Sequence, residues 1–358
     1  MGKITKGDRM KRFISLLLIF LLFGCGNKEV ITEVKEKKIE VKKELTLDDY
    51  KNNNVDELGE VPIMMYHGIH NKLNSETDYI GGNVDKDGYQ RTIEAFKNDL
   101  EFYYNSGYRM IRLNDYVDGN IDVELGKSPI IITFDDGLIN NINVNGLDEN
   151  GEIIIDPNSA VGVLESFKKK YPDYNVTATF FINGGIFQQE EYNEKILKWL
   201  VKNGYDIGNH TYSHVNFSKV DSVKSEEEVG KIYEILDQII PNKYVNIVAL
   251  PFGSPYSIDH ENMQYIFSSN YNNKNYVTKS ALRVGWKAES SPFSIEFNPK
   301  FLKRIRAYDN NGEEFDIEMN FKLLENTRYI SDGDVDTVVI PSNKQEFLND
   351  IKKEIKIY

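Results

Sequence analysis

Short apolar runs alternate with longer amphipathic stretches along most of the chain. Residues 129–134 (PIIITF) form a continuous, mostly β-branched run, the pattern of a strand buried on both faces. Stretches such as residues 92–107 and 159–171 instead carry apolar residues at helical spacing. Alternation of strand and helix with short connections predicts an α/β fold built on a parallel sheet or barrel.

The predicted elements follow from this pattern. The strands are expected at residues 61–66, 108–113, 129–134, 176–182, 205–210 and 245–250. The helices are expected at residues 92–107, 159–171, 191–204 and 225–240, the last beginning with a capping box of Ser225 and Glu228. Residues 138–158 are a long polar insertion after a strand, which we expect to form a loop over the site.

The first residues have the pattern of a targeting signal. A basic segment precedes an apolar run at residues 13–23, and Gly24-Cys25 follows. The run is shorter than the ~20 residues that a transmembrane helix needs. Leu22–Cys25 resembles a bacterial lipobox, and the alternative is a chance cysteine within an ordinary signal or anchor. The resemblance implies lipidation at Cys25 and a lipid-anchored location on the extracytoplasmic side of the cell membrane.

These patterns divide the chain into four parts. Residues 1–24 are predicted to be a lipoprotein signal peptide and residues 25–58, rich in Lys and Glu, a charged tether. The folded domain is predicted at residues 59–310, and residues 311–358 are expected to form a C-terminal extension packed on it.

Charge and cysteine content narrow the function classes. The 358 residues include 43 Lys and Arg against 56 Asp and Glu, a net charge of −13 that argues against a nucleic-acid partner. The single cysteine excludes an internal disulfide and a cysteine-based metal site within the sequence. Metal ligands would therefore have to come from carboxylates and the five histidines.

Three polar clusters follow predicted strands. Asp135-Asp136 comes after residues 129–134, His210 and His214 follow residues 205–209, and Phe252 lies just after residues 245–250. In parallel α/β folds the carboxyl ends of strands carry the site. One carboxylate and two histidines with an open fourth position suit a catalytic metal, and the second carboxylate could act as a base. An Asp-Asp-Gly turn or a surface histidine pair is the structural alternative.

The motifs resemble those of a known family. ITFDDG (132–137), TATFFING (177–184) and HTYSH (210–214) are similar, in order and spacing, to motifs of the NodB-homology polysaccharide deacetylases, carbohydrate esterase family 4. This resemblance implies a distorted (β/α)7-type barrel with parallel strands. It also implies metal-dependent deacetylation of sugars. A late stretch, residues 328–341, resembles the end of deacetylase-like bacterial lipoproteins.

The resemblance assigns roles to individual residues. It implies Asp135 as the general base, and Asp136, His210 and His214 as ligands of a divalent metal. Zn²⁺ is the first expectation, with Co²⁺, Ni²⁺ or Fe²⁺ as alternatives. The backbone N–H of Phe252 would help to hold the oxyanion.

Two departures from the family pattern stand out. Ala249 occupies the place of the arginine that orients the base, and no histidine follows His260 in the chain to serve as the acid. A strand ending in Tyr66-His67 resembles a branch that includes deacetylases of exported poly-N-acetylglucosamine, in which the acid histidine comes from the N-terminal strand. We therefore expect His67 to be the acid, and the alternative is a structural histidine at a strand end.

Residues near the end of the predicted domain are candidates for the substrate pocket. Trp286 is expected to wall the acetyl pocket, with a core position as the alternative. Arg304 or Arg306 could replace the missing arginine near Asp135, with surface charge as the alternative, and Arg306 is expected to lie in the substrate pocket.

The sequence therefore predicts a hydrolase that removes N-acetyl groups from a cell-wall or exported glycan containing N-acetylglucosamine. The expected partners are this N-acetylated glycan and, through the lipid, the membrane. One alternative is a weak or inactive deacetylase-fold lipoprotein that binds cell-wall glycan. Another is a transporter's solute-binding lipoprotein, a class with no need for paired aspartates and paired histidines.

Overall fold

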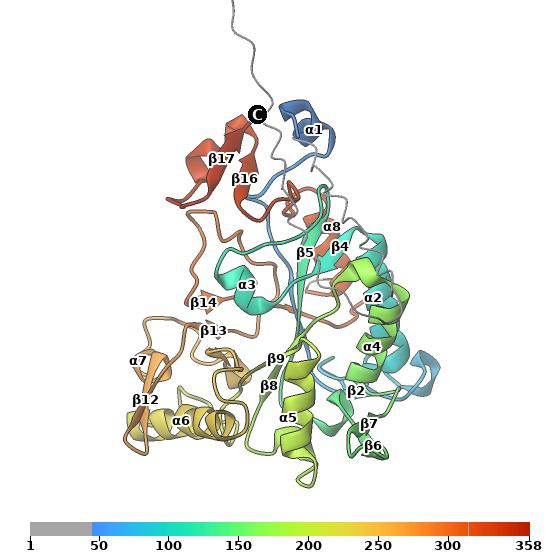
Figure 1. Cartoon of the computed structure of the whole chain (residues 1–358), viewed down its shortest axis with the longest axis vertical. Coiled ribbons are helices and arrows are strands. Elements are labelled where there is room, and N and C mark those ends of the chain that lie inside the picture. The colour runs from blue at the N-terminus through green and yellow to red at the C-terminus, as the bar shows by residue number, and fades with distance from the viewer. Residues whose placement is uncertain (1–44, 314) are drawn as a thin grey trace, which may run out of the picture. The chain divides into compact units, whose positions relative to one another are not determined.

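The computed structural model describes residues 45–313 and 315–358 (Figure 1). Residues 45–358 form one compact unit. The predicted signal peptide, Cys25 and most of the predicted tether lie outside the described residues. Within the part that is described, none of the helices has the length and apolar character required to cross a membrane.

The centre of the unit is a nine-stranded sheet in which every pairing is parallel. Its order is β14 (Phe301–Leu302), β13 (Ser280–Leu282), β10 (Ile247–Ala249), β9 (Asp206–Asn209), β8 (Thr179–Ile182), β5 (Ser128–Phe134), β1 (Ile63–Tyr66) and β15 (Ile305–Arg306), with β4 (Tyr108–Met110) also paired to β5.

The two ends of this strand order are close in the chain. Leu302 ends β14 and Ile305 begins β15, so about 11 Å of extended chain at most separates the opposite edges of the sheet. The sheet must therefore curl until its edges approach each other. The predicted α/β fold, a distorted barrel of parallel strands, is confirmed.

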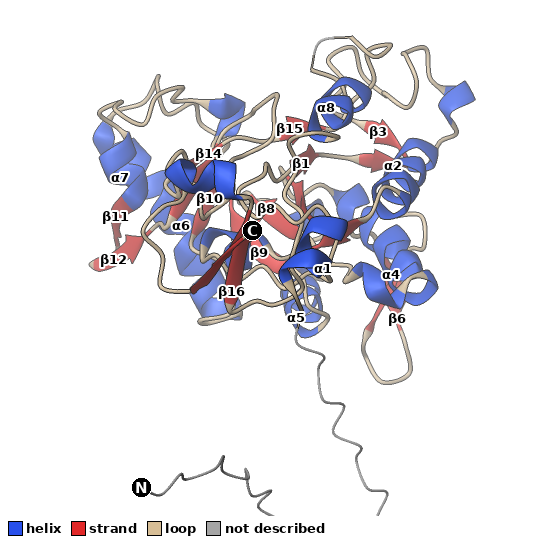
Figure 2. Ribbon diagram, turned by 90° about the horizontal axis from the view of Figure 1, so that it is seen from above, coloured by secondary structure: helices blue, strands red, loops and turns tan. Residues whose placement is uncertain are grey.

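Helices surround this curled sheet (Figure 2). The longer ones are α2 (Ile93–Asn105), α4 (Ala160–Lys170), α5 (Asn193–Lys202) and α6 (Ser222–Ile239), and the shorter ones are α1 (Leu47–Asn52), α3 (Leu113–Val117), α7 (Met263–Phe267) and α8 (Ile317–Leu324). Each of the longer helices buries one apolar face, as its sequence period predicts.

The polar insertion at residues 138–158 is a hairpin rather than a plain loop. Strands β6 (Val144–Leu147) and β7 (Ile153–Ile155) pair antiparallel. Just before the hairpin, Asn141 donates a hydrogen bond from Nδ2 to the carbonyl oxygen of His67 at 2.7 Å. The insertion therefore fastens the chain where it leaves β1.

Two further strand pairs flank the barrel. Strand β2 (Ile69–His70) pairs in parallel with β3 (Arg91–Thr92), and β11 (Ser268–Tyr271) pairs antiparallel with β12 (Lys274–Val277).

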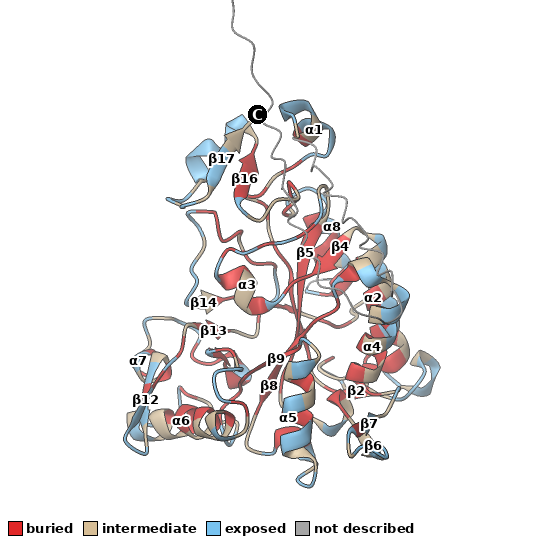
Figure 3. Cartoon of the chain, viewed as in Figure 1, coloured by how far each residue is buried: buried red, intermediate tan, exposed pale blue. Residues whose placement is uncertain are grey.

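The two ends of the described chain meet. Tyr50 and Val55 are buried against Val339 of β16 (Thr337–Ile340). Strand β16 pairs with β17 (Glu354–Ile357), and both are drawn close to α1 (Figure 3). Residues 45–58, which the sequence analysis assigned to the tether, therefore belong to the described unit. The sequence pattern missed this because a single aromatic side chain in a charged stretch carries little periodic signal.

Candidate metal and catalytic site

The polar clusters predicted at strand ends come together in one pocket. Asp135 and Asp136 follow β5, His210 and His214 follow β9, and His67 follows β1. The cavity measures about 280 Å³ and is lined by His67, Tyr89, Gln90, Asp135, Asp136, His210, His214, Leu250, Phe252 and Val284. All six residues predicted to act as catalytic groups or metal ligands therefore line the same cavity.

Asp136, His210 and His214 have the geometry of a metal site. Asp136 Oδ1 lies 3.1 Å from His210 Nε2 and 3.3 Å from His214 Nε2. The three ligand atoms lie within 4.8 Å of one another. Asp136 Oδ1 and His210 Nε2 are buried, and neither completes a hydrogen bond.

The other nitrogen of His210 is held in place. His210 Nδ1 lies 2.9 Å from the carbonyl oxygen of Ala249, so its proton sits on Nδ1 and the Nε2 lone pair faces the cavity. Two imidazole nitrogens and one carboxylate oxygen fit a divalent metal such as zinc. The residues present therefore fit the expected cofactor.

The backbone at the site adopts an uncommon conformation. Asp136 (φ +73°), Thr211 (φ +64°), His214 (φ +54°) and Phe252 (φ +59°) are all left-handed. This conformation costs a non-glycine residue roughly 1–2 kcal/mol. Such residues persist only where the surrounding fold imposes them, and here they aim two metal-ligand side chains and the predicted oxyanion donor at the cavity.

Arg304 takes the place of the arginine that the sequence lacks at position 249. Its guanidinium makes two hydrogen bonds to Asp135, at 2.8 Å and 2.7 Å, and both side chains are fully buried. Burial acts to raise the pKa of Asp135, but Arg304 and then His210 outweigh it and hold this pKa below its ordinary value. Asp135 is therefore ionised, as a base must be.

His67 faces the same cavity. The His67 and Tyr89 rings pack in a T-shaped arrangement with their centres 5.0 Å apart. The Nδ1 atom of His67 is buried and has no hydrogen-bond partner among the described residues. Burial lowers the pKa of His67, while the charges of Asp135 and Asp136 oppose that shift. The remaining histidines are structural, since His70 contacts Gln90 at 3.0 Å and His260 accepts a hydrogen bond from the Asn262 N–H.

The two predicted pocket residues lie outside this lining. Trp286 is 47% exposed and packs against Phe315, while Arg306 stacks over Tyr89 and Tyr308 at the margin of the cavity. The walls that sequence reasoning missed are Tyr89, Gln90, Leu250 and Val284. Tyr89 and Gln90 lie in a polar segment with no motif, so no pattern in the sequence marks them.

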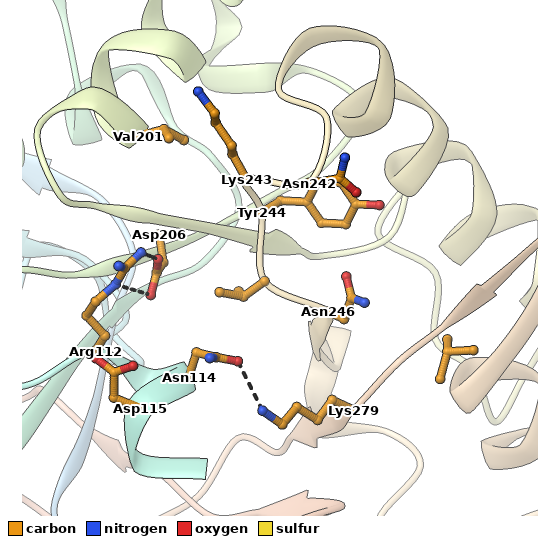
Figure 4. A pocket seen from close by; sticks show the side chains of 12 residues that line it. Arg112, Asn114, Asp115, Val201, Asp206, Asn242, Lys243, Tyr244, Asn246 and Lys279 are labelled. Atoms are coloured by element: carbon orange, nitrogen blue, oxygen red, sulfur yellow. Dashed lines mark hydrogen bonds and ion pairs between the residues drawn. The ribbon is translucent and has the colours of Figure 1, made fainter. Parts of the chain in front are cut away.

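A larger cavity lies elsewhere in the described part of the chain. It measures about 670 Å³. It lies where β9, β10 and β13 begin (Figure 4), whereas the metal site lies where strands end. Asp206, Asn246 and Lys279 line it, and Asp206 is paired with Arg112. Chemistry and strand polarity, rather than volume, therefore identify the candidate site.

Comparison with known proteins gives a family. Residues 122–266 match the model described as polysaccharide deacetylase. A peptidoglycan-N-acetylglucosamine deacetylase of Bacillus cereus is 39% identical over 70 residues, 20% of this chain and 24% of that protein. A chitin deacetylase of Arthroderma benhamiae is 32% identical over 74 residues, 21% of this chain and 20% of that protein. The chain thus spans about a quarter or less of the length of these relatives.

One of the solved structures similar to this chain is a bacterial deacetylase. The Streptococcus pyogenes deacetylase PplD, in complex with acetate, is 19% identical, with 71% of this chain and 94% of that chain covered and a TM-score of 0.49.

The polysaccharide deacetylase family indicated by the motifs is therefore confirmed for residues 122–266, whereas the expected lipoprotein branch stays a prediction. The matched segment contains Asp135, Asp136, His210, His214 and Phe252. The remaining parts of the site come from either side of that segment: His67 directly follows β1, and Arg304, the arginine on Asp135, directly precedes β15.

Proposed function

We propose that the protein is a metal-dependent hydrolase that removes N-acetyl groups from a glycan containing N-acetylglucosamine. One observation carries the proposal: three candidate metal ligands, Asp136, His210 and His214, line one cavity with Asp135, a buried carboxylate paired with Arg304. The names of the two relatives, which refer to peptidoglycan and chitin, support an N-acetylated glycan as the substrate class.

The three ligands would hold Zn²⁺, with Co²⁺, Ni²⁺ or Fe²⁺ as alternatives. Such an ion polarises a carbonyl and makes a nearby water more acidic. Asp135 accepts a proton from the attacking water, whose oxygen bonds to the acetamide carbon. The Phe252 N–H stabilises the negative oxygen that develops. The carbon–nitrogen bond then breaks, His67 gives a proton to the departing amine, and acetate leaves.

Location is part of the proposal. The signal-peptide pattern and the lipobox around Cys25 support anchoring by lipid on the outer side of the cell membrane. That location would restrict the enzyme to cell-wall or exported polysaccharide. A radiolabelled fatty acid that is incorporated by the wild-type protein but not by Cys25→Ala would support it.

Acetate release is the direct test. Purified protein loaded with zinc, cobalt or nickel is expected to release acetate from peptidoglycan, chitin oligomers or poly-N-acetylglucosamine. Replacing the base, Asp135→Asn, should lower kcat about 10²–10⁴-fold. Metal content measured by emission spectroscopy should stay at one ion per chain, because Asp135 is not among the predicted ligands.

The non-catalytic alternative loses its main support. It rested on the missing arginine, and Arg304 supplies that guanidinium from the short connection between β14 and β15. Metal binding without acetate from any of these glycans would nevertheless select a glycan-binding protein over a deacetylase.

A further inference from the structure

Among the described arginines, Arg306 lacks the hydrogen-bonding partner that most of the others have. Five of the described arginines donate guanidinium hydrogen bonds to an oxygen of the protein: Arg91, Arg109, Arg112, Arg304 and Arg328. The guanidinium of Arg306, although half-buried, has no ion pair or hydrogen bond with any described residue. A half-buried charge without a partner requires an explanation.

Two aromatic rings hold Arg306 in place instead. The guanidinium carbon lies 3.9 Å from the ring centre of Tyr308 and 4.9 Å from that of Tyr89. Stacking on an aromatic face orients a guanidinium and leaves its N–H groups free to donate in the plane. The side chain is therefore fixed while its hydrogen-bond donors remain unused.

This unused cation lies at the margin of the candidate active site. Tyr89, one of its two ring partners, lines the cavity and meets the ring of His67 at 5.0 Å. Arg306 is also only two residues along the chain from Arg304, which donates hydrogen bonds to Asp135. A substrate in the cavity would extend past it.

A second arginine near the cavity shows the same pattern. Arg283 precedes Val284, a lining residue, and its guanidinium stacks at 5.5 Å on Trp286 and 5.3 Å on Phe301. Its Nε is buried without a hydrogen-bond partner. Two unpaired arginines beside one cavity are unexpected in a chain with a net charge of −13.

We propose that Arg306 binds an anionic group of the glycan, a carboxylate or a phosphate, next to the sugar that loses its acetyl group. This inference rests on the proposed deacetylase function and narrows its substrate to an anionic glycan. A planar guanidinium donates two parallel hydrogen bonds to either anion. Arg283 extends the same positive margin toward Trp286.

The test compares matched oligosaccharides of different charge. The neutral probe is the N-acetylglucosamine tetramer, and the carboxylated probe is a tetramer of alternating N-acetylglucosamine and N-acetylmuramic acid. A third probe is the N-acetylglucosamine tetramer carrying 6-phosphates. We expect wild-type kcat/KM to be about tenfold higher for one of the anionic probes, and which one it is identifies the anion.

Variants separate Arg306 from general electrostatics. Arg306→Gln should remove most of the preference for the anionic probe, and Arg306→Lys should restore only part of it, since a lysine keeps the charge but not the paired donors. Lys243→Gln removes the same charge in the large cavity at the other end of the strands and should leave the preference intact.

The outcomes are distinguishable. Equal wild-type kcat/KM for all three probes, or a preference that Arg306→Gln leaves unchanged, overturns the inference while the deacetylase proposal stands. If the wild-type protein releases no acetate from any probe, the proposed function fails. Binding of the three tetramers to the metal-free protein, measured by calorimetry, then still tests Arg306, and equal affinities would overturn its role.

Discussion

Asp135 and Arg304 form a buried ion pair whose remaining hydrogen bonds are also satisfied. Besides Asp135, the guanidinium donates to Thr133 Oγ1 at 3.1 Å and to the carbonyl oxygen of Arg283 at 2.9 Å. A buried ion pair offsets the cost of dehydrating its charges only when such additional bonds are present. The same contacts fix the direction of the carboxylate that faces the cavity.

Removing the arginine should therefore affect both stability and the pH profile. Arg304→Gln leaves the carboxylate buried without its cation, which should cost about 3–5 kcal/mol of unfolding free energy. Because Arg304 holds the pKa of Asp135 low, that pKa should rise in the variant. The activity of the variant should accordingly be lost at a higher pH than wild-type activity as the solution is acidified.

The measurement is kcat/KM against pH, with urea unfolding on the same preparations. Arg304→Lys is the matched control, since it keeps a cation beside Asp135 and should shift the acidic limb less. An acidic limb that does not move in either variant would show that Arg304 is only structural.

The motif residues of the site could be predicted because the family pattern places them directly after strands. The Asp135–Arg304 pair could only be offered as an option, since 168 intervening residues hide the contact. It forms because β15 joins the sheet next to β1, which itself lies next to β5. Nothing in the local sequence specifies that neighbour.

At the level of elements, helix α6 holds the histidine loop in place. Glu228, fully buried on α6, accepts hydrogen bonds from the N–H and the hydroxyl of Ser213, both at 2.6 Å. Its backbone oxygen accepts the N–H of Tyr212 at 3.0 Å. The loop that carries His210 and His214 is therefore tied to a helix that does not reach the metal site.

Glu228→Ala should weaken metal binding although Glu228 touches no ligand atom. Loss of such supporting contacts typically lowers metal affinity about 10–100-fold. Competition with a chelator measures the zinc affinity of the variant and of the wild-type protein. Glu227→Gln changes the neighbouring, half-buried glutamate, which pairs with Lys224 and Lys231, and should leave the affinity unaltered.

The sequence predicts the type of each main helix and strand better than it predicts where the element begins and ends. The apolar runs marked the main strands correctly, but helix α6 begins at Ser222, three residues before the predicted start. Its cap is Asp221, which accepts the Lys224 N–H, while the Ser225 hydroxyl donates to the Asp221 carbonyl. A Ser-x-x-Glu pattern inside a helix imitates a capping box, and Asp221 competes for the same role.

On the scale of the whole molecule, Glu57 joins the beginning and the end of the folded unit. This buried carboxylate accepts hydrogen bonds from the Tyr329 hydroxyl at 2.7 Å, the Val339 N–H at 2.7 Å and the Asp332 N–H at 3.2 Å. Burial, followed by the nearby Asp332 charge, raises the pKa of Glu57 to about 8. The contact between the first and last segments of the folded unit is therefore sensitive to pH.

The sign of that sensitivity follows from the raised pKa. The folded state keeps a proton on Glu57 that the unfolded chain loses near its ordinary pKa of 4.5. This contribution to stability is complete below pH 4.5 and is lost as the pH rises through about 8. Unfolding free energy should therefore fall by about 1 kcal/mol per pH unit across this interval from Glu57 alone.

Urea unfolding at several pH values measures that slope. Glu57→Gln, which cannot ionise, should flatten it, and Glu60→Gln at a half-exposed neighbour should not. An unchanged slope in Glu57→Gln would assign the pH dependence to other groups.

The contacts of Glu57 also constrain the order in which the parts of the chain can fold. Its hydrogen-bonding partners lie within residues 329–339, more than 270 positions later in the chain, and are therefore synthesised much later. A chain that emerges from a ribosome or an export channel with its N-terminus first must keep Glu57 and the apolar residues around it unsatisfied until nearly everything else has followed. Chaperones or the channel itself would have to protect that segment during the interval, and a protein released early would be open to proteolysis there.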